Sequence, residues 1–231
     1  MPLSSLEGLK IPQTYWDDLA YFVSLSNRTM WIIDDIDEST LEVMKYIVLW
    51  NEEDAKGKIP LEQRKPIRLK IFSHGGDADV GDSMYELIKS SETKVIAYNM
   101  GLVASAAFDI YIACDERITY PGSKFLVHEG SMRVSGQNSS VENYTDMSKK
   151  TKARMIDRIA EQTNLSVKTL KGKIASDWWF FGEEAIKLGV AHRLWTHEDF
   201  ALKTIWKKGA RASFFAILII CYFFNFFSHY K

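Results

Sequence analysis

Strand-like and helix-like hydrophobic patterns alternate along the chain between residues 30 and 130. Apolar runs at 30–35, 67–72, 93–98 and 125–128 predict strands, and segments with helical character occupy 41–50, 77–90 and 103–114. Polar capping residues precede the first two of these helices, and Gly101 predicts a turn after the third strand. Alternating units of this kind predict an α/β domain with a largely parallel sheet, whose active loops lie at the carboxyl ends of strands.

The pattern changes after residue 130. Residues 130–140 are rich in Gly and Ser, and residues 141–163 form a charged segment with a helical apolar stripe. The residues of that stripe are Val141, Tyr144, Met147, Met155, Ile156 and Ile159. The stripe predicts a long amphipathic arm, which shorter helices at 165–170 and 182–188 follow. A charged segment at 51–66, with one Gly and two Pro, predicts a loop.

Composition fits one main domain with an appendage, since the chain has 231 residues of which 46% are apolar. The formal net charge of -1, from 29 basic and 30 acidic residues, gives no sign of a nucleic-acid partner. Two cysteines, Cys114 and Cys221, do not suffice for a disulfide framework and suit a reducing compartment. The N-terminus lacks the pattern of a signal peptide, so a cytoplasmic location is expected.

The C-terminal segment 212–230 is strongly hydrophobic and contains no Lys, Arg, Asp or Glu. As a helix it would be ~28 Å long, close to the ~30 Å hydrocarbon thickness of a bilayer. Lys207, Lys208 and Arg211 precede it, as expected for a flank that stays cytoplasmic. Membrane association through 212–230 and burial against a neighbouring subunit both remain open.

Three residues far apart in the chain supply the side chains of a serine-hydrolase triad: Ser105, His128 and Asp177. A Ser hydroxyl becomes a good nucleophile when a neutral imidazole accepts its proton, and a carboxylate then orients that imidazole. Upstream, Ser-His-Gly-Gly (73–76) ends an apolar run, and backbone without side chains there can offer N–H groups to an oxyanion. If a helix begins near 103, Ser105 lies in its first turn, at the positive end of its dipole.

Each of these residues has a competing interpretation. Ser105 alone would be a capping or packing residue, and His74 competes with His128 as a histidine near substrate. Asp109 and Asp115 compete with Asp177, but Asp109 lies one helical turn from Ser105 and is badly placed to reach the far side of the imidazole. The aromatic run 178–181 suits a core or a subunit interface better than a substrate subsite.

The motifs together resemble those of the ClpP-type serine peptidases, the proteolytic subunits of Clp proteases, over residues 28–197. That family has a Ser-Pro-Gly-Gly loop, a nucleophile in Gly-x-Ala-Ala-Ser-Met-Gly-Ala-Phe, a strand-ending Ile-His-Gln-Pro and an Asp before a Ser-Ala-x-Glu-Ala helix. Here the similar segments are Ser-His-Gly-Gly (73–76), Gly-Leu-Val-Ala-Ser-Ala-Ala-Phe (101–108), Val-His-Glu-Gly (127–130), and Asp177 ahead of Gly-Glu-Glu-Ala (182–185). The chain departs at His74, Ala106, Ala107, Glu129 and Gly130. A carboxylate at Glu129 should raise the pKa of His128 if the two groups approach.

The resemblance implies a ClpP/crotonase-like α/β fold of repeated ββα units with a protruding handle helix. It divides the chain into an N-terminal segment (1–27), a peptidase domain (28–200, handle at about 131–163) and a C-terminal tail (201–231). It implies that Ser105, His128 and Asp177 are catalytic, that N–H groups of Gly76 and Ala106 form the oxyanion hole, and that backbone at Gly75, Asp77 and Gly130 binds substrate.

By the same resemblance, the subunits form stacked heptameric rings, and a separate Clp-type ATPase unfolds protein substrates and feeds them in. No metal or other cofactor is expected. Two other classes remain: a crotonase-type acyl-CoA enzyme, which needs no such triad, and a noncatalytic or membrane-tethered, signal-peptide-peptidase-like member of the family.

Overall fold

The computed structural model describes residues 13–131 and 133–199. Two units are distinguished, one ending at Leu194 and the other beginning at Trp195, and the second contains the short 3-10 helix η4 (His197–Asp199). The strands of the first unit are β1 (Thr29–Ile36), β2 (Ile67–Gly76), β3 (Val95–Ala104), β4 (Glu116–Thr119), β5 (Lys124–Val127), β6 (Trp178–Phe181) and β7 (Arg193–Leu194). Its helices are α1 (Gln13–Ser26), α2 (Leu41–Lys56), α3 (Ala78–Ser90), α4 (Ala106–Ala113), α5 (Asn138–Gln162), α6 (Val167–Lys173) and α7 (Gly182–Lys187), with 3-10 turns η2 (Glu38–Thr40) and η3 (Leu61–Gln63).

The sheet forks at β3. Parallel strands follow the order β1-β2-β3-β4-β7, while β5 leaves this path, pairing with β3 in parallel and with β6 in antiparallel fashion. The first half of β3 pairs with β4 from Ile96 to Asn99, and the second half pairs with β5 from Leu102 to Ala104. One strand therefore has two successive neighbours on the same edge.

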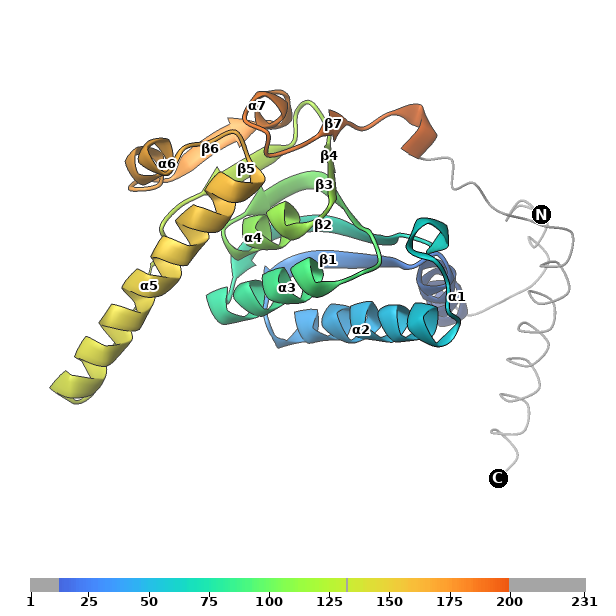
Figure 1. The fold of residues 1–231 in the computed structure, drawn as a ribbon, viewed down its shortest axis with the longest axis horizontal. Helices are drawn as coiled ribbons and strands as arrows, with labels where there is room; N and C mark the ends of the chain where they lie inside the picture. Colours follow the sequence, from blue (N-terminus) through green and yellow to red (C-terminus); the bar gives the residue numbers. More distant parts are fainter. Residues whose placement is uncertain (1–12, 132, 200–231) are drawn as a thin grey trace, which may run out of the picture. The chain divides into compact units, whose positions relative to one another are not determined.

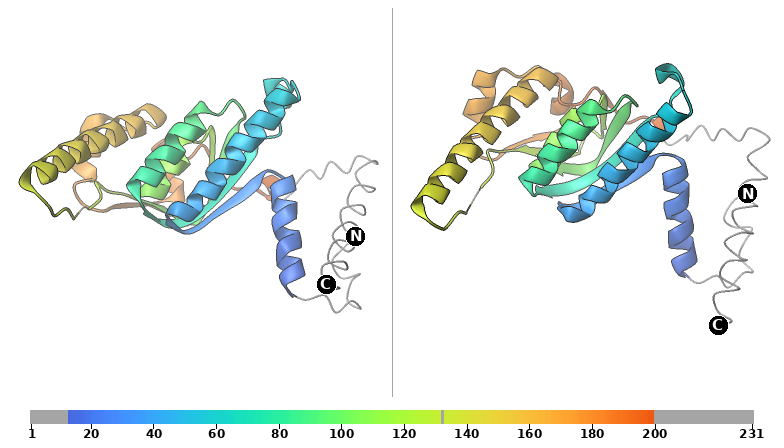
Figure 2. Two further views of the ribbon diagram at one scale, coloured as in Figure 1. Left: turned by 90° about the horizontal axis from the view of Figure 1, so that it is seen from below. Right: turned by 60° about the horizontal axis from the view of Figure 1, so that its bottom comes forward.

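Helices α2, α3 and α4 lie along one face of the sheet (Figures 1 and 2). Their apolar stripes meet the inward side chains of the strands in one core, where Ile47, Ile71, Met84, Phe108 and Phe125 are at most 1% exposed. Burying each such side chain stabilises the fold by roughly 1.5–3 kcal/mol. Phe108 also packs edge-to-face on Phe125, with ring centroids 6.2 Å apart, which ties α4 to β5.

Helix α5 is the arm that the sequence predicts. Its C-terminal part is buried at Ile156 and Ile159, whereas Tyr144 and Met147 in its N-terminal half are more than half exposed. That half extends away from the sheet (Figure 1). Near its base, Arg158 donates to Asp82 of α3 at 2.7 Å and also contacts Glu86 of the same helix.

The predicted α/β class with a parallel sheet is confirmed, but several boundaries were wrong. Helix α2 runs to Lys56, into the segment expected to be a loop. The chain does not turn at Gly101, because β3 continues through it to Ala104. Helix α4 consequently begins at Ala106 rather than near 103, so Ser105 precedes the helix. The sequence patterns also missed α1, β4 and the strand character of β6.

Within 13–131 and 133–199, no helix is both long and apolar enough to cross a membrane. The hydrophobic segment 212–230 and Cys221 lie outside the described residues.

Candidate active site

Strand register brings Ser105, His128 and Asp177 together. Ala104 of β3 pairs with Leu126 of β5, and the Ser105 N–H donates to the Leu126 carbonyl at 3.0 Å. On the other edge of β5, Val127 pairs with Trp178, the residue after Asp177. The three residues are therefore neighbours across the sheet, although more than seventy positions separate the first from the last.

The side chains form a hydrogen-bonded line. His128 Nε2 lies 2.8 Å from Ser105 Oγ, and His128 Nδ1 lies 3.2 Å from Asp177 Oδ1. A neutral imidazole with its proton on Nδ1 can donate to the carboxylate and accept from the hydroxyl at the same time. The His128 side chain is 26% exposed and that of Asp177 is 62% exposed. The Asp177 carboxylate is therefore accessible to solvent in an isolated subunit.

Ser105 occupies a sharp strand-to-helix turn. Its φ of 52° and ψ of -128° are unfavourable for a residue with a side chain, and such strain persists where the surroundings determine the conformation. Gly75 supplies part of those surroundings, since a Cβ at Gly75 would lie 2.5 Å from the Ser105 Cβ and 3.1 Å from the Ala106 nitrogen. Only glycine fits at this position, and a φ of +99° also favours glycine over any residue with a side chain.

The remaining predicted positions lie at the end of β2 and in the segment after β5. Gly76 ends β2 opposite Ile36, and a Cβ there would lie 2.3 Å from the Ile36 carbonyl oxygen. The Asp77 N–H donates to that oxygen at 2.7 Å, and the Asp77 carboxylate caps α3 by accepting from the N–H groups of Asp79 and Val80. Gly130, with φ of +78°, follows the exposed residue Glu129.

The competing residues lie elsewhere. His74 is exposed, and the Asp115 carboxylate accepts the Val95 N–H at 2.8 Å, beyond the C-terminal end of α4. Asp109 lies on α4, where burial, followed by the charge of Asp82, raises its pKa to about 7. The structure thus brings Asp177, rather than Asp109 or Asp115, to the imidazole.

Glu129 is engaged by the arm. Its carboxylate forms an ion pair with Lys152 of α5, and its N–H donates to the Ile174 carbonyl at 3.1 Å. Sequence reasoning missed Lys152 and the buried amide of Asn99 in β3, and no pattern distinguishes Lys152 from the other charged residues of α5. A lone amide in an otherwise apolar strand was the one available signal for Asn99.

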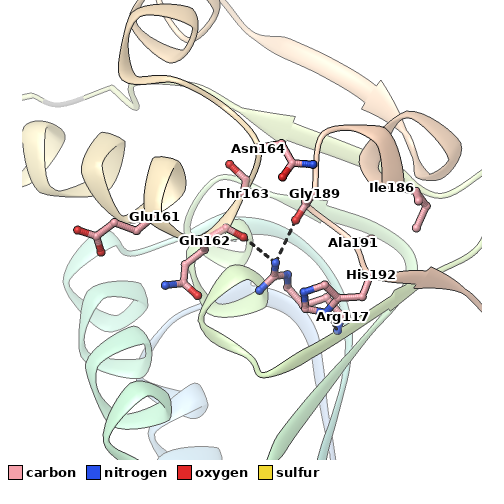
Figure 3. A pocket seen from close by; sticks show the side chains of 9 residues that line it. All are labelled: Arg117, Glu161, Gln162, Thr163, Asn164, Ile186, Gly189, Ala191 and His192. Atoms are coloured by element: carbon pink, nitrogen blue, oxygen red, sulfur yellow. Dashed lines mark hydrogen bonds between the residues drawn. The ribbon is translucent and has the colours of Figure 1, made fainter.

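A separate hollow of about 420 Å³ lies beside Arg117, between the end of α5, α7 and β4 (Figure 3). The guanidinium of Arg117 is buried and donates to five carbonyls, those of Ile112, Cys114, Gln162, Gly189 and Val190. Burial lowers the pKa of Arg117, but every donor is paired. None of the triad residues lines this hollow. Because all five Arg117 donors bind backbone carbonyls of this chain, the guanidinium stabilises the packing of these segments and is not directed at a ligand.

Comparisons with known proteins identify the family to which the chain belongs. Residues 19–198 match the family model described as Clp protease. The ATP-dependent Clp protease proteolytic subunit 2 of Treponema denticola is 30% identical over 136 residues, which cover 58% of this chain and 68% of the relative. The ATP-dependent Clp protease proteolytic subunit 2 of Pseudomonas aeruginosa is 29% identical over 167 residues, which cover 68% of this chain and 83% of the relative. A solved structure of a mutant of ClpP1 from Listeria monocytogenes superposes with a TM-score of 0.64 at 25% identity, covering 75% of this chain and 94% of that one. The chain belongs to the Clp protease family.

Proposed function

We propose that this chain is a serine endopeptidase subunit that hydrolyses peptide bonds in peptides and unfolded proteins. The observation that carries the proposal is the continuous line from Ser105 Oγ to His128 to Asp177, with separations of 2.8 Å and 3.2 Å. Nucleophile and base lie within the hydrogen-bonding reach that proton transfer needs, and the base is oriented by a third group.

In the proposed reaction, Ser105 Oγ attacks the substrate carbonyl carbon while its proton passes to His128 Nε2. Asp177 holds the ring and stabilises the imidazolium. His128 then protonates the leaving amine as the C–N bond breaks, which leaves an acyl group on Ser105. A water molecule, deprotonated by His128, releases the acyl group as a carboxylic acid and restores the enzyme. No metal or other cofactor enters these steps.

The oxyanion formed on attack would be bound by N–H groups of Gly76 and Ala106. In a parallel ladder a residue bonds to the two neighbours of the residue opposite it, so Ile36 engages Asp77 and leaves the Gly76 N–H directed away from β1. Ala106 is the first residue of α4, where N–H groups have no partner within the helix and the dipole favours negative charge.

Substrate would lie extended along backbone at Gly75, Asp77 and Gly130. Main-chain hydrogen bonds of this kind give affinity with little dependence on side chains. The Asp77 N–H donates to the Ile36 carbonyl, and the Asp77 carbonyl accepts the Gly81 N–H at 3.1 Å, so a substrate N–H would use the second lone pair of that carbonyl.

Assembly into stacked heptameric rings that work with a separate Clp-type ATPase is part of the proposal. Exposed apolar side chains on two parts of the first unit support association. Trp31, Ile33, Phe72, Trp179 and Phe181 are 43–56% exposed on the strands, and Tyr144 and Met147 are exposed on the arm. Apolar surface of this kind favours burial against other subunits. Native mass spectrometry of the full chain measures the subunit number, and a monomer at micromolar concentration would contradict this part of the proposal.

Fluorophosphonate labelling tests the chemistry, because the reagent phosphonylates an activated Ser. We expect stoichiometric labelling of the assembled full chain at Ser105, and loss of both labelling and peptide hydrolysis in Ser105→Ala. Ser139→Ala, at an exposed position of α5, is the matched control and should label fully. An unlabelled wild-type oligomer would instead indicate a noncatalytic subunit.

Location is tested separately. Membrane fractionation of the full chain and of a chain lacking 212–231 distinguishes an anchored protein, which leaves the membrane on truncation, from a cytoplasmic one, which fractionates as soluble in both forms.

A further inference from the structure

Asn99 is a fully buried amide at the fork of the sheet. The last pair between β3 and β4 is Asn99 with Thr119, and the first pair between β3 and β5 is Leu102 with Lys124. Asn99 thus lies where β3 exchanges one neighbour for the other. A polar side chain in this interior is unfavourable unless its donors and acceptors are paired.

Both ends of the amide are paired. Oδ1 of Asn99 accepts the Gly101 N–H at 2.8 Å, and Nδ2 donates to the Lys124 carbonyl at 3.1 Å. The Gly101 N–H can only donate and the Lys124 carbonyl can only accept. These two bonds therefore fix the orientation of the Asn99 amide, with Oδ1 toward Gly101 and Nδ2 toward β5. The Asn99 carbonyl also accepts from Ser123 Oγ at 3.4 Å. Asn99 therefore joins β3 to the start of β5.

The backbone next to Asn99 is irregular and needs this support. Ile71 of β2 pairs with Asn99, and Ser73 pairs with Val103. An advance of two residues along β2 therefore corresponds to an advance of four residues along β3. This bulge takes the Gly101 N–H out of the regular ladder, and Asn99 accepts it instead. Gly101 has φ of +142°, and a Cβ there would lie 3.2 Å from the Phe72 ring.

The ladder beyond the bulge is short, yet it sets the distance between nucleophile and base. It has three pairs, from Leu102–Lys124 to Ala104–Leu126. Ser105 lies one residue beyond its end on β3, and His128 lies two residues beyond its end on β5. A slip of one residue would turn each side chain of a strand to the opposite face, and three pairs alone define the register weakly.

We propose that Asn99 is a positioning residue, which pins β5 against β3 and so holds His128 within hydrogen-bonding reach of Ser105. The kinetic consequence rests on the proposed peptidase function, whereas the effect on register does not. Asn99 acts through two strands and does not touch the reacting atoms.

Asn99→Leu tests the proposal, since it removes both side-chain hydrogen bonds and keeps a side chain of similar size. The Ser105 N–H, which donates to Leu126, reports the register directly. We expect its native-state hydrogen exchange to accelerate about tenfold relative to amides of the central strand β2. We also expect kcat for a short peptide and the rate of fluorophosphonate labelling to fall by about 100-fold, with KM unchanged.

Ile47→Ala is the control for general destabilisation, because Ile47 is fully buried on α2 and belongs to the core rather than to the site. It should lower Tm without selective exchange at Ser105 and without a change in kcat at temperatures well below Tm. Unchanged exchange and labelling in Asn99→Leu would overturn the proposal, as would an equal kinetic loss in Ile47→Ala. If wild-type Ser105 is not labelled at all, the peptidase function fails, and the exchange experiment still decides the role of Asn99.

Discussion

Replacing Asp109 by Asn is expected to stabilise the protein by an amount that grows with pH. Helices α3 and α4 approach closely, because a Cβ at Gly81 would lie only 3.1 Å from the Ala106 Cβ. This approach brings Asp82, the residue after Gly81, toward α4. Burial, and then the charge of Asp82, raise the pKa of Asp109 from 3.8 to about 7, while Arg158 acts in the opposite direction.

The sign and size of this effect on stability follow from the linkage between proton binding and folding. Between pH 3.8 and about 7 the unfolded chain has ionised Asp109 and the folded chain has not, so stability is lost as pH rises through that window. At 1.36 kcal/mol per pH unit, the full difference corresponds to about 4 kcal/mol above pH 7, of which about 1.5 kcal/mol has developed by pH 5. Asp109 is only partly buried, so water screens part of this penalty and the first figure is a ceiling.

Thermal melts of the full chain at pH 5 and pH 8 measure the effect. Asp109→Asn should raise Tm on the order of 10 °C at pH 8 and a few degrees at pH 5. Asp157→Asn, the same change at an exposed position of α5, should leave Tm nearly unchanged at both. A Tm difference for Asp109→Asn that is the same at pH 5 and pH 8, or a destabilisation at pH 8, would refute the reasoning.

Three further predictions concern the site and its supports. Gly75→Ala should abolish labelling of Ser105 and peptide hydrolysis, because the new Cβ would lie 2.5 Å from the Ser105 Cβ; labelling at more than a tenth of the wild-type rate would contradict the contact. Arg117→Met should lower the free energy of unfolding, measured by urea titration, by at least about 3 kcal/mol, because five carbonyls lose their donor. An unchanged urea midpoint would show that water replaces the guanidinium without loss of stability. Glu129→Gln should change stability by less than about 1 kcal/mol, because Glu129 and Lys152 are 42% and 41% exposed, and a larger loss would show that this pair anchors the arm.

The side chains that meet at the candidate site could be identified from the sequence, and the backbone that brings them together could not. Ser105, His128 and Asp177 were identifiable because their side-chain types and their order along the chain carry the information. The run Leu-Val-Ala-Ser-Ala-Ala (102–107) is apolar without a clear period, so strand and helix were equally compatible with it. The strand continues to Ala104 because β5 pairs with it there, and that pairing depends on residues more than twenty positions away.

The same distinction applies to Gly101 and Asn99. A glycine after an apolar run usually marks a turn, and here it marks a bulge, because Asn99 accepts the N–H that the bulge exposes. Asn99, two residues before Gly101, was therefore the informative residue, since an amide within the apolar run 95–104 must be paired internally if the run is buried. Such an amide predicts a break in the regular ladder, and in this fold the break is what lets β3 leave β4 and meet β5 close to the nucleophile.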